Sequence, residues 1–228
     1  SFMGAHPRFR VTVEKGRVHI IYPDNMKIIT GDPFSILQQL LNQYYIPSHQ
    51  CPHLPFIGGF VGYFGFEMLK YVEKISTHTN DPHQAMEGCW LFYDQVLVID
   101  QLEKRAYITR LYQEGESLEE LENELARKIA RIQEASQGVC RSIQIDNSIF
   151  PHIAFEQTET YTSYIQKIRA IKEYIAQGDI YQACFTHRFS TTLQSDPYLI
   201  YQVLRQINPA PFSCYLKINN LQILSSSP

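Results

Sequence analysis

Short turns between β-rich runs are the feature that most limits how this chain can fold. Three pairs of such runs occur, at residues 9–14 and 18–22, 90–100 and 105–112, and 212–218 and 221–226. The first pair is separated by Lys15-Gly16-Arg17 and the third by Asn219-Asn220, both of which suit β-hairpin turns. Parallel strands need connections of roughly a dozen residues or more, so turns this short predict antiparallel pairs.

Helix-capping residues mark two predicted helices in the first half of the chain. Asp32 is expected to cap a helix that begins at Pro33, because proline suits the first helical position. Ser117 and Glu120 form a capping box ahead of a long amphipathic helix whose first turns are strongly acidic. We expect the acidic side chains to form a solvated helix face.

The second half of the chain also alternates between helix and strand patterns. An apolar stripe from Tyr164 to Ile175 predicts a helix that ends at Gly178. Residues 182–190 are expected to form a strand, and residues 198–207 a further helix. Taken together, the patterns predict an α+β protein with helices packed on antiparallel sheet.

Residues 137–151 are the best candidate for a linker, because they are mixed in polarity and weak in periodicity. They divide the chain into a sheet-plus-helices region at 1–136 and a second region at 152–228. The chain stops directly after a strand-like run, so we expect it to be part of a longer sequence.

Composition excludes several classes of partner. A formal net charge of -3 gives no broad positive field, so we expect no nucleic-acid partner. No apolar stretch approaches the roughly 20 residues that span a bilayer, so we expect no membrane partner. Five cysteines without a CxxC pair favour reduced thiols and a cytoplasmic location. They are Cys51, Cys89, Cys140, Cys184 and Cys214.

Four glycines lie among aromatic residues in the segment from 55 to 67. A phosphate-binding loop is one interpretation, but the spacing matches neither GxGxxG nor GxxxxGK[ST], and no lysine follows closely. The favoured interpretation is structural: glycines let a strand pack closely, while neighbouring aromatic side chains fill a core. Those side chains are Phe56, Phe60, Tyr63 and Phe66.

No catalytic or metal-binding set is apparent from the residues themselves. His187 lies within a predicted strand, where packing is favoured over catalysis, and Cys184 has no identifiable activating neighbour. Ser225-Ser226-Ser227 lacks the glycines of a nucleophile elbow, and no histidine pair has metal-ligand spacing. On these grounds alone the function stays open.

Four motifs in order resemble the anthranilate/aminodeoxychorismate (para-aminobenzoate) synthase component I family. They are Ser1-Phe2-Met3-Gly4 with Pro7, the segment Pro55–Glu67, Gly178-Asp179-Ile180-Tyr181-Gln182 running into Arg188-Phe189, and Leu204-Arg205-Gln206-Ile207-Asn208-Pro209-Ala210-Pro211-Phe212-Ser213 continuing to Ile223–Pro228. The resemblance implies two stacked antiparallel sheets with helices outside, and makes residues 152–228 the start of the chorismate-binding domain.

The resemblance also implies a function for the parent protein. Such a protein adds ammonia to chorismate, requires Mg²⁺, and receives the ammonia from a glutamine amidotransferase subunit. The family's catalytic and metal-binding residues would lie beyond Pro228. We therefore expect no catalytic residue and no metal ligand in this chain, and no turnover by the chain alone.

One family site falls within the chain. Residues 208–213 match the stretch that contacts tryptophan in tryptophan-binding relatives, so the candidate effector-binding residues are Asn208, Pro209, Pro211, Phe212 and Ser213. The alternative is that Asn208-Pro209 merely ends a helix before a strand, because a residue before proline avoids helical angles.

The sequence Ala210-Pro211-Phe212-Ser213 is more similar to the aminodeoxychorismate branch, which makes a folate precursor. That branch is our first expectation. The alternatives are anthranilate synthase component I of the tryptophan pathway and a noncatalytic module that binds an effector or a partner.

Overall fold

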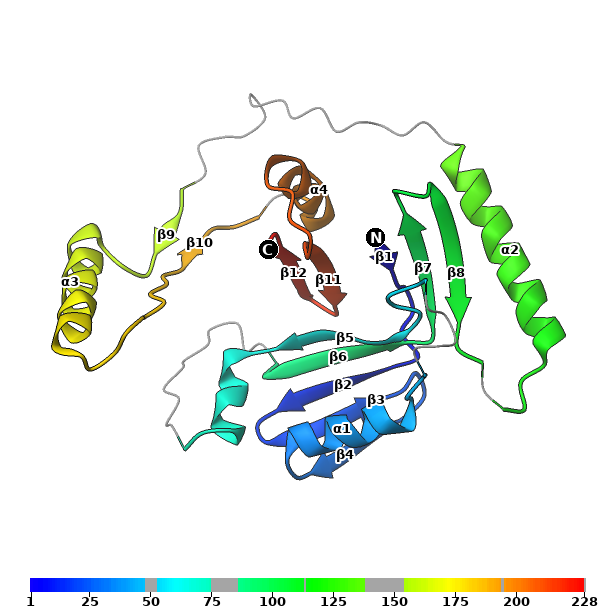
Figure 1. Ribbon diagram of the computed structural model, residues 1–228, viewed down its shortest axis with the longest axis horizontal. Helices are drawn as coiled ribbons and strands as arrows, with labels where there is room; N and C mark the ends of the chain where they lie inside the picture. The colour runs from blue at the N-terminus through cyan, green and yellow to red at the C-terminus, as the bar shows by residue number, and fades with distance from the viewer. Residues whose placement is uncertain (48–52, 75–85, 113, 138–153, 194, 228) are drawn as a thin grey trace. The chain divides into compact units, whose positions relative to one another are not determined.

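The computed structural model describes residues 1–47, 53–74, 86–112, 114–137, 154–193 and 195–227 (Figure 1). The chain divides into two compact units, Ser1–Cys140 and Arg141–Pro228. The predicted linker, residues 137–151, lies outside the described residues except for Gln137, which caps a helix of the first unit.

The first unit is built mainly from antiparallel strands. Its elements are β1 (Phe2–Met3), β2 (Phe9–Glu14), β3 (Arg17–Ile21), β4 (Met26–Thr30), α1 (Pro33–Gln43), β5 (Gly59–Phe64), the 3₁₀ helix η2 (Phe66–Tyr71), β6 (Gly88–Tyr93), β7 (Gln95–Asp100), β8 (Arg105–Arg110) and α2 (Leu118–Ser136). Five strands form a sheet in the order β4-β3-β2-β6-β5, and three form a sheet in the order β1-β7-β8.

The β2–β3 hairpin and the helix after it follow the predicted local chemistry. Lys15 and Gly16 both have positive φ, 49° and 78°, so they form the tight turn between the two strands. Asp32 caps α1 by accepting the Ser35 backbone N–H at 2.8 Å, and Pro33 is the first helical residue.

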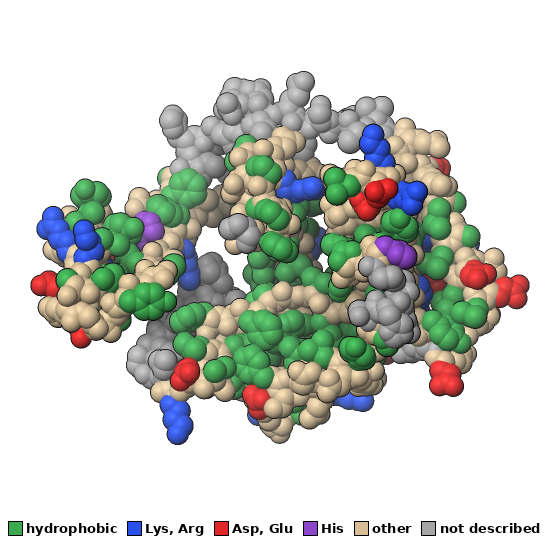
Figure 2. Space-filling model, viewed as in Figure 1, with side chains coloured by type: hydrophobic (Ala, Val, Ile, Leu, Met, Phe, Trp, Pro, Cys, Tyr) green, Lys and Arg blue, Asp and Glu red, His purple; other side chains and the backbone are tan. Residues whose placement is uncertain are grey.

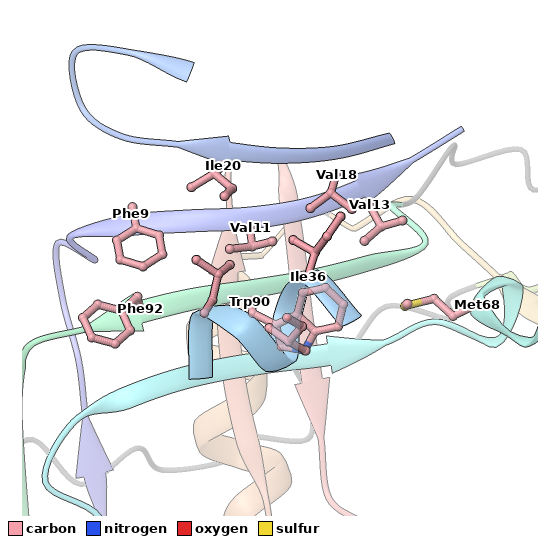
Figure 3. Close-up of a cluster of buried hydrophobic side chains, with 11 residues drawn as sticks. Phe9, Val11, Val13, Val18, Ile20, Ile36, Met68, Trp90 and Phe92 are labelled. Atoms are coloured by element: carbon pink, nitrogen blue, oxygen red, sulfur yellow. The ribbon is translucent and has the colours of Figure 1, made fainter. Parts of the chain in front are cut away.

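The core of the first unit lies between α1 and the five-stranded sheet (Figure 3). Alternate residues of β2, β3 and β6 point to the same face, as strand geometry requires, and meet the apolar face of α1. The Phe9 and Phe92 rings stack with centroids 4.8 Å apart. The buried cluster consists of Phe9, Val11, Val13, Val18, Ile20, Ile36, Leu37, Leu40, Met68, Trp90 and Phe92.

The strand predicted over residues 90–100 is interrupted, which corrects the expectation of one continuous strand. It breaks at Asp94 into β6, which joins the five-stranded sheet, and β7, which pairs with β8 in the other sheet. The Asp94 carbonyl accepts the Leu111 N–H at 2.7 Å, and its carboxylate lies against Arg110. Asp94 is thus the point at which the chain passes from one sheet to the next.

The α2 helix is a solvated helix, as its acidic sequence predicted. Ser117 caps it by accepting the Glu120 N–H at 3.4 Å, and none of its residues is fully buried. Figure 2 shows acidic side chains exposed along it. Lys128 reaches from α2 to Gln95 of β7 at 2.5 Å, which fixes one turn of the helix near the three-stranded sheet.

The second unit contains β9 (Glu156–Gln157), α3 (Tyr161–Gln177), β10 (Phe189–Ser190), α4 (Pro197–Ile207), β11 (Cys214–Ile218) and β12 (Leu221–Ser225). The α3 helix ends at Gly178, which has φ 85° as a left-handed cap. The β11–β12 hairpin turns at Asn219, whose φ is 52°.

The strand predicted over residues 182–190 is wrong for most of its length. Only Phe189 and Ser190 pair with a neighbour, namely β9, and residues 182–188 have no regular structure. In the described parts of the chain every strand pair is antiparallel, so the α+β fold class is confirmed. No helix among the described residues is long and apolar enough to cross a membrane.

Candidate functional site

The glycine-rich segment is a structural strand. Residues 59–64 form β5, whose Gly62 lies opposite Trp90 of β6. A Cβ on Gly62 would overlap the Cys89 carbonyl oxygen and lie 2.6 Å from the Trp90 Cα, so only glycine fits here. A Cβ on Gly65 would likewise lie 2.6 Å from the Glu87 carbonyl oxygen. The glycines therefore allow two backbones to approach, and the packing interpretation is supported over the phosphate loop.

The aromatic residues of this segment have different surroundings. Phe60 packs against the Phe92 ring at 4.9 Å, and Tyr63 donates a hydrogen bond to the Met86 carbonyl at 3.1 Å. Phe66 is 72% exposed, which corrects the expectation that it fills the core. It begins the 3₁₀ helix η2, where Met68 is the buried residue instead.

Glu87 is the centre of a polar cluster that holds η2 against the sheet. Its carboxylate accepts from Lys70 Nζ at 2.5 Å, from the Tyr71 hydroxyl at 2.6 Å and from the Lys15 backbone N–H at 3.1 Å. Burial acts to raise the pKa of Glu87, but the donations from Lys70 and Tyr71 outweigh it and lower the pKa. Burial, followed by the hydrogen bond to Glu87, raises the pKa of Tyr71.

A second charged cluster surrounds the break between β6 and β7. Arg110 contacts both Asp94 and Glu116, the latter at 3.2 Å, and Arg8 lies 3.9 Å from Asp94. A shallow hollow of about 200 Å³ lies beside it, lined by residues that include Arg8, Tyr44 and Asp94. The charges alternate in sign along the cluster, so it stabilises the passage between sheets and leaves no excess charge for a substrate.

The candidate effector residues form the loop 208–213, between α4 and β11 in the second unit. Asn208 caps α4 with φ -138° and ψ 72°, and its N–H donates to the Leu204 carbonyl at 2.9 Å. Ser213 closes the loop, because its backbone N–H and its hydroxyl both donate to the Ala210 carbonyl, at 3.2 and 2.9 Å. The loop is therefore a hydrogen-bonded turn.

The surface of the loop is apolar and open to water. Phe212 is 79% exposed, and Asn208, Pro209 and Pro211 are exposed beside it, while Ser213 is partly buried. An exposed phenylalanine that follows two exposed prolines is suited to contact an apolar or aromatic group. The structure thus brings the five predicted residues together on one short loop.

Sequence reasoning missed one residue at this loop. Ser226, directly after β12, donates its hydroxyl to the Asn208 carbonyl, 18 residues earlier in the chain. In the sequence, Ser226 belongs to the Ser225-Ser226-Ser227 run and to the motif segment Ile223–Pro228, and neither indicates a contact with residue 208. Its role in the structure is to bond the start of the loop.

Packing with other side chains accounts for His187 and Cys89, two of the remaining candidates from the sequence. His187 lies among the rings of Tyr164 and Phe189, with centroids at 5.3 and 4.5 Å. Cys89, Cys184 and Cys214 are free thiols. Burial raises the pKa of the Cys89 thiol to about 11, which makes it a poor nucleophile.

Magnesium has no recognisable site in the described parts of the chain. No group of three or more histidine, cysteine, aspartate or glutamate side chains there could hold a metal ion. The residues described do not fit a Mg²⁺ site, so no chemical step is assigned to one in this chain.

Comparison with known proteins identifies the family. The family model described as "chorismate binding enzyme" matches residues 3–228. The chain belongs to the chorismate-binding enzyme family. That match spans both structural units and includes the loop 208–213.

Two relatives are similar to this chain over its entire length. It is 29% identical to the chloroplastic anthranilate synthase alpha subunit 2 of Arabidopsis thaliana, covering 100% of this chain and 39% of the relative. It is also 29% identical to anthranilate synthase component 1 of Acetivibrio thermocellus, covering 100% of this chain and 47% of that protein. The chain thus spans less than half the length of these relatives.

A solved structure shows the same fold. The crystal structure of anthranilate synthase component I from Streptococcus pneumoniae TIGR4 superposes with a TM-score of 0.80 at 23% sequence identity, covering 100% of this chain and 50% of that one. The preference for the aminodeoxychorismate branch finds no support here, because the relatives and the solved structure are all anthranilate synthase subunits by name.

Proposed function

We propose that this chain is the N-terminal part of a chorismate-aminating synthase subunit of the anthranilate synthase component I type. The observation that carries the proposal is the family match over residues 3–228, joined to relatives that are anthranilate synthase subunits along the whole chain. The parent protein would convert chorismate and ammonia to anthranilate, with release of pyruvate and water. A glutamine amidotransferase subunit would supply the ammonia.

In this proposal the chain supplies structure and regulation. The first unit contributes sheets and buried packing, and the charges of its two clusters are paired with one another. The loop 208–213 would bind an aromatic amino acid, with Phe212 and the two prolines as its apolar contact surface. Chorismate chemistry and Mg²⁺ binding would belong to residues outside this chain.

Aminodeoxychorismate synthesis is the second candidate, and it is favoured by one observation. Residues Ala210-Pro211-Phe212-Ser213 resemble that branch, in which the product leads to folate. A noncatalytic binding module is a third candidate, since the residues that we describe contain no identifiable catalytic set. We also propose that the protein is located in the reducing environment of the cytoplasm, which the cysteine pattern favours.

Product identity separates these candidates. The protein in its full natural length would be incubated with chorismate, Mg²⁺ and ammonia, and the products separated by liquid chromatography with fluorescence detection. Anthranilate is the expected product. Aminodeoxychorismate, detected as para-aminobenzoate after addition of the matching lyase, would favour the second candidate, and unchanged chorismate would favour a noncatalytic module.

A further inference from the structure

The loop 208–213 is bonded at both ends and in its middle. Its first carbonyl, that of Asn208, accepts the Ser226 hydroxyl, and its turn is closed by the two donations of Ser213 to Ala210. Its last residue leads into β11, where Cys214 pairs with Ser225 of β12. The hydrogen bond from the Ser226 side chain thus joins the loop to the residue that directly follows β12.

The position of the Asn208 peptide determines where the exposed surface points. Asn208 donates its N–H to the Leu204 carbonyl of α4, and Pro209 follows it with a fixed φ and no N–H to donate. The direction of the loop from there depends on how the Asn208 carbonyl is held. Because Phe212 is 79% exposed, core packing does little to fix the position of its side chain. The hydrogen bonds of the loop therefore contribute most to fixing its conformation.

We propose that Ser226 is a positioning residue for ligand binding at the loop 208–213. Its hydroxyl holds the Asn208 carbonyl, so that the Phe212 and proline surface is already arranged before a ligand arrives. A preorganised loop loses less conformational freedom on binding, which raises affinity. This inference rests on the proposed effector role of the loop.

The same bond links the loop to the segment after β12. If a ligand shifts the Asn208 peptide, the Ser226 hydroxyl must move with it or lose its acceptor. Ser225 accepts the Ser227 N–H at 3.4 Å, so Ser226 lies within a short turn that leaves the hairpin. By thermodynamic linkage, a change in that turn alters ligand affinity as much as the ligand alters the turn.

The test compares Ser226→Ala, which removes the hydroxyl, with Ser226→Thr, which keeps it. The matched control is Ser136→Ala, because Ser136 also donates its hydroxyl to a backbone carbonyl, that of Gln133 at 2.7 Å, but in α2 of the first unit. L-tryptophan affinity would be measured by calorimetry on the full-length protein, together with thermal stability and the rate of product formation from chorismate.

We expect Ser226→Ala to weaken L-tryptophan binding by about 3- to 10-fold, the effect of losing one hydrogen bond. Ser226→Thr should restore it, and Ser136→Ala should leave it unchanged. Equal affinity in Ser226→Ala and wild type would overturn the inference and leave the proposed function intact. Product formation without any L-tryptophan binding by wild type would overturn the inference and the effector role, but not the proposed reaction. Absence of product from wild type would count against the proposed function itself.

Discussion

Gly62→Ala should strongly destabilise the first unit. The new Cβ would lie 2.6 Å from the Trp90 Cα, about 0.8 Å short of the 3.4 Å at which ordinary contact begins, and would overlap the Cys89 carbonyl oxygen. Both obstacles are backbone atoms, so β5 must move away from β6. Separation of that size breaks the adjacent ladder hydrogen bonds and adds packing strain, for a cost of about 3 kcal/mol or more.

The assay is thermal unfolding followed by the fluorescence of Trp90, the only tryptophan of the sequence, which lies in β6 itself. For a protein of this size we expect the midpoint to fall by roughly 6–12 °C. Gly16→Ala is the control: nothing lies within 4 Å of its Cβ, so only its φ of 78° is strained, at about 1 kcal/mol. An unchanged midpoint for Gly62→Ala, with loss of a bound ligand instead, would refute this reasoning and restore the phosphate-loop interpretation.

Three further predictions concern the polar cluster, the loop and the chain as a whole. Glu87→Gln should cost about 1.5–3 kcal/mol at neutral pH, because it weakens the bonds from Lys70 and Tyr71. The pKa of Glu87 is lowered below its usual 4.5, so the stabilisation is complete above that value and lost as the pH falls through the folded pKa. In denaturant unfolding, the free energy of unfolding of Glu87→Gln should therefore be lower than that of wild type at pH 7, and this difference should shrink in acid. A difference that does not depend on pH would contradict this. Phe212→Ala should change stability by no more than about 0.5 kcal/mol, because the side chain is 79% exposed, while weakening L-tryptophan binding by calorimetry. Unchanged binding would remove Phe212 from the site. This chain alone should form no product from chorismate, Mg²⁺ and ammonia, and turnover by chromatographic assay would show that it contains a catalytic set.

Local chemistry made much of the fold predictable. The capping roles of Asp32, Ser117 and Gly178 depend on neighbours within a few residues, and all three were confirmed. The hairpin turns at Lys15-Gly16 and Asn219 were likewise readable, because each needs a residue that tolerates positive φ.

Features set by distant partners could not be read from the sequence. The break at Asp94 depends on Arg110 and Leu111, which approach only after the sheets form. Residues 182–188 have a strand-like composition, but a strand also needs a neighbour to pair with, and only Phe189 and Ser190 have one among the described residues.

The candidate site, too, could be predicted only in part. Residues 208–213 were found through the family motif, since their composition alone suggested only a helix end. Ser226 lies in the same motif, but its contact could not be predicted, because a hydroxyl that reaches a carbonyl 18 residues away leaves no periodic signal.

Chorismate consumption is the measurement that tests the central claim most directly. The full-length protein would be supplied with chorismate, Mg²⁺ and ammonia, and the loss of chorismate and the gain of anthranilate fluorescence followed together. We expect the two to match in amount, with ammonia required for both. Chorismate that stays unchanged under these conditions would contradict the claim that this chain is part of a chorismate-aminating enzyme.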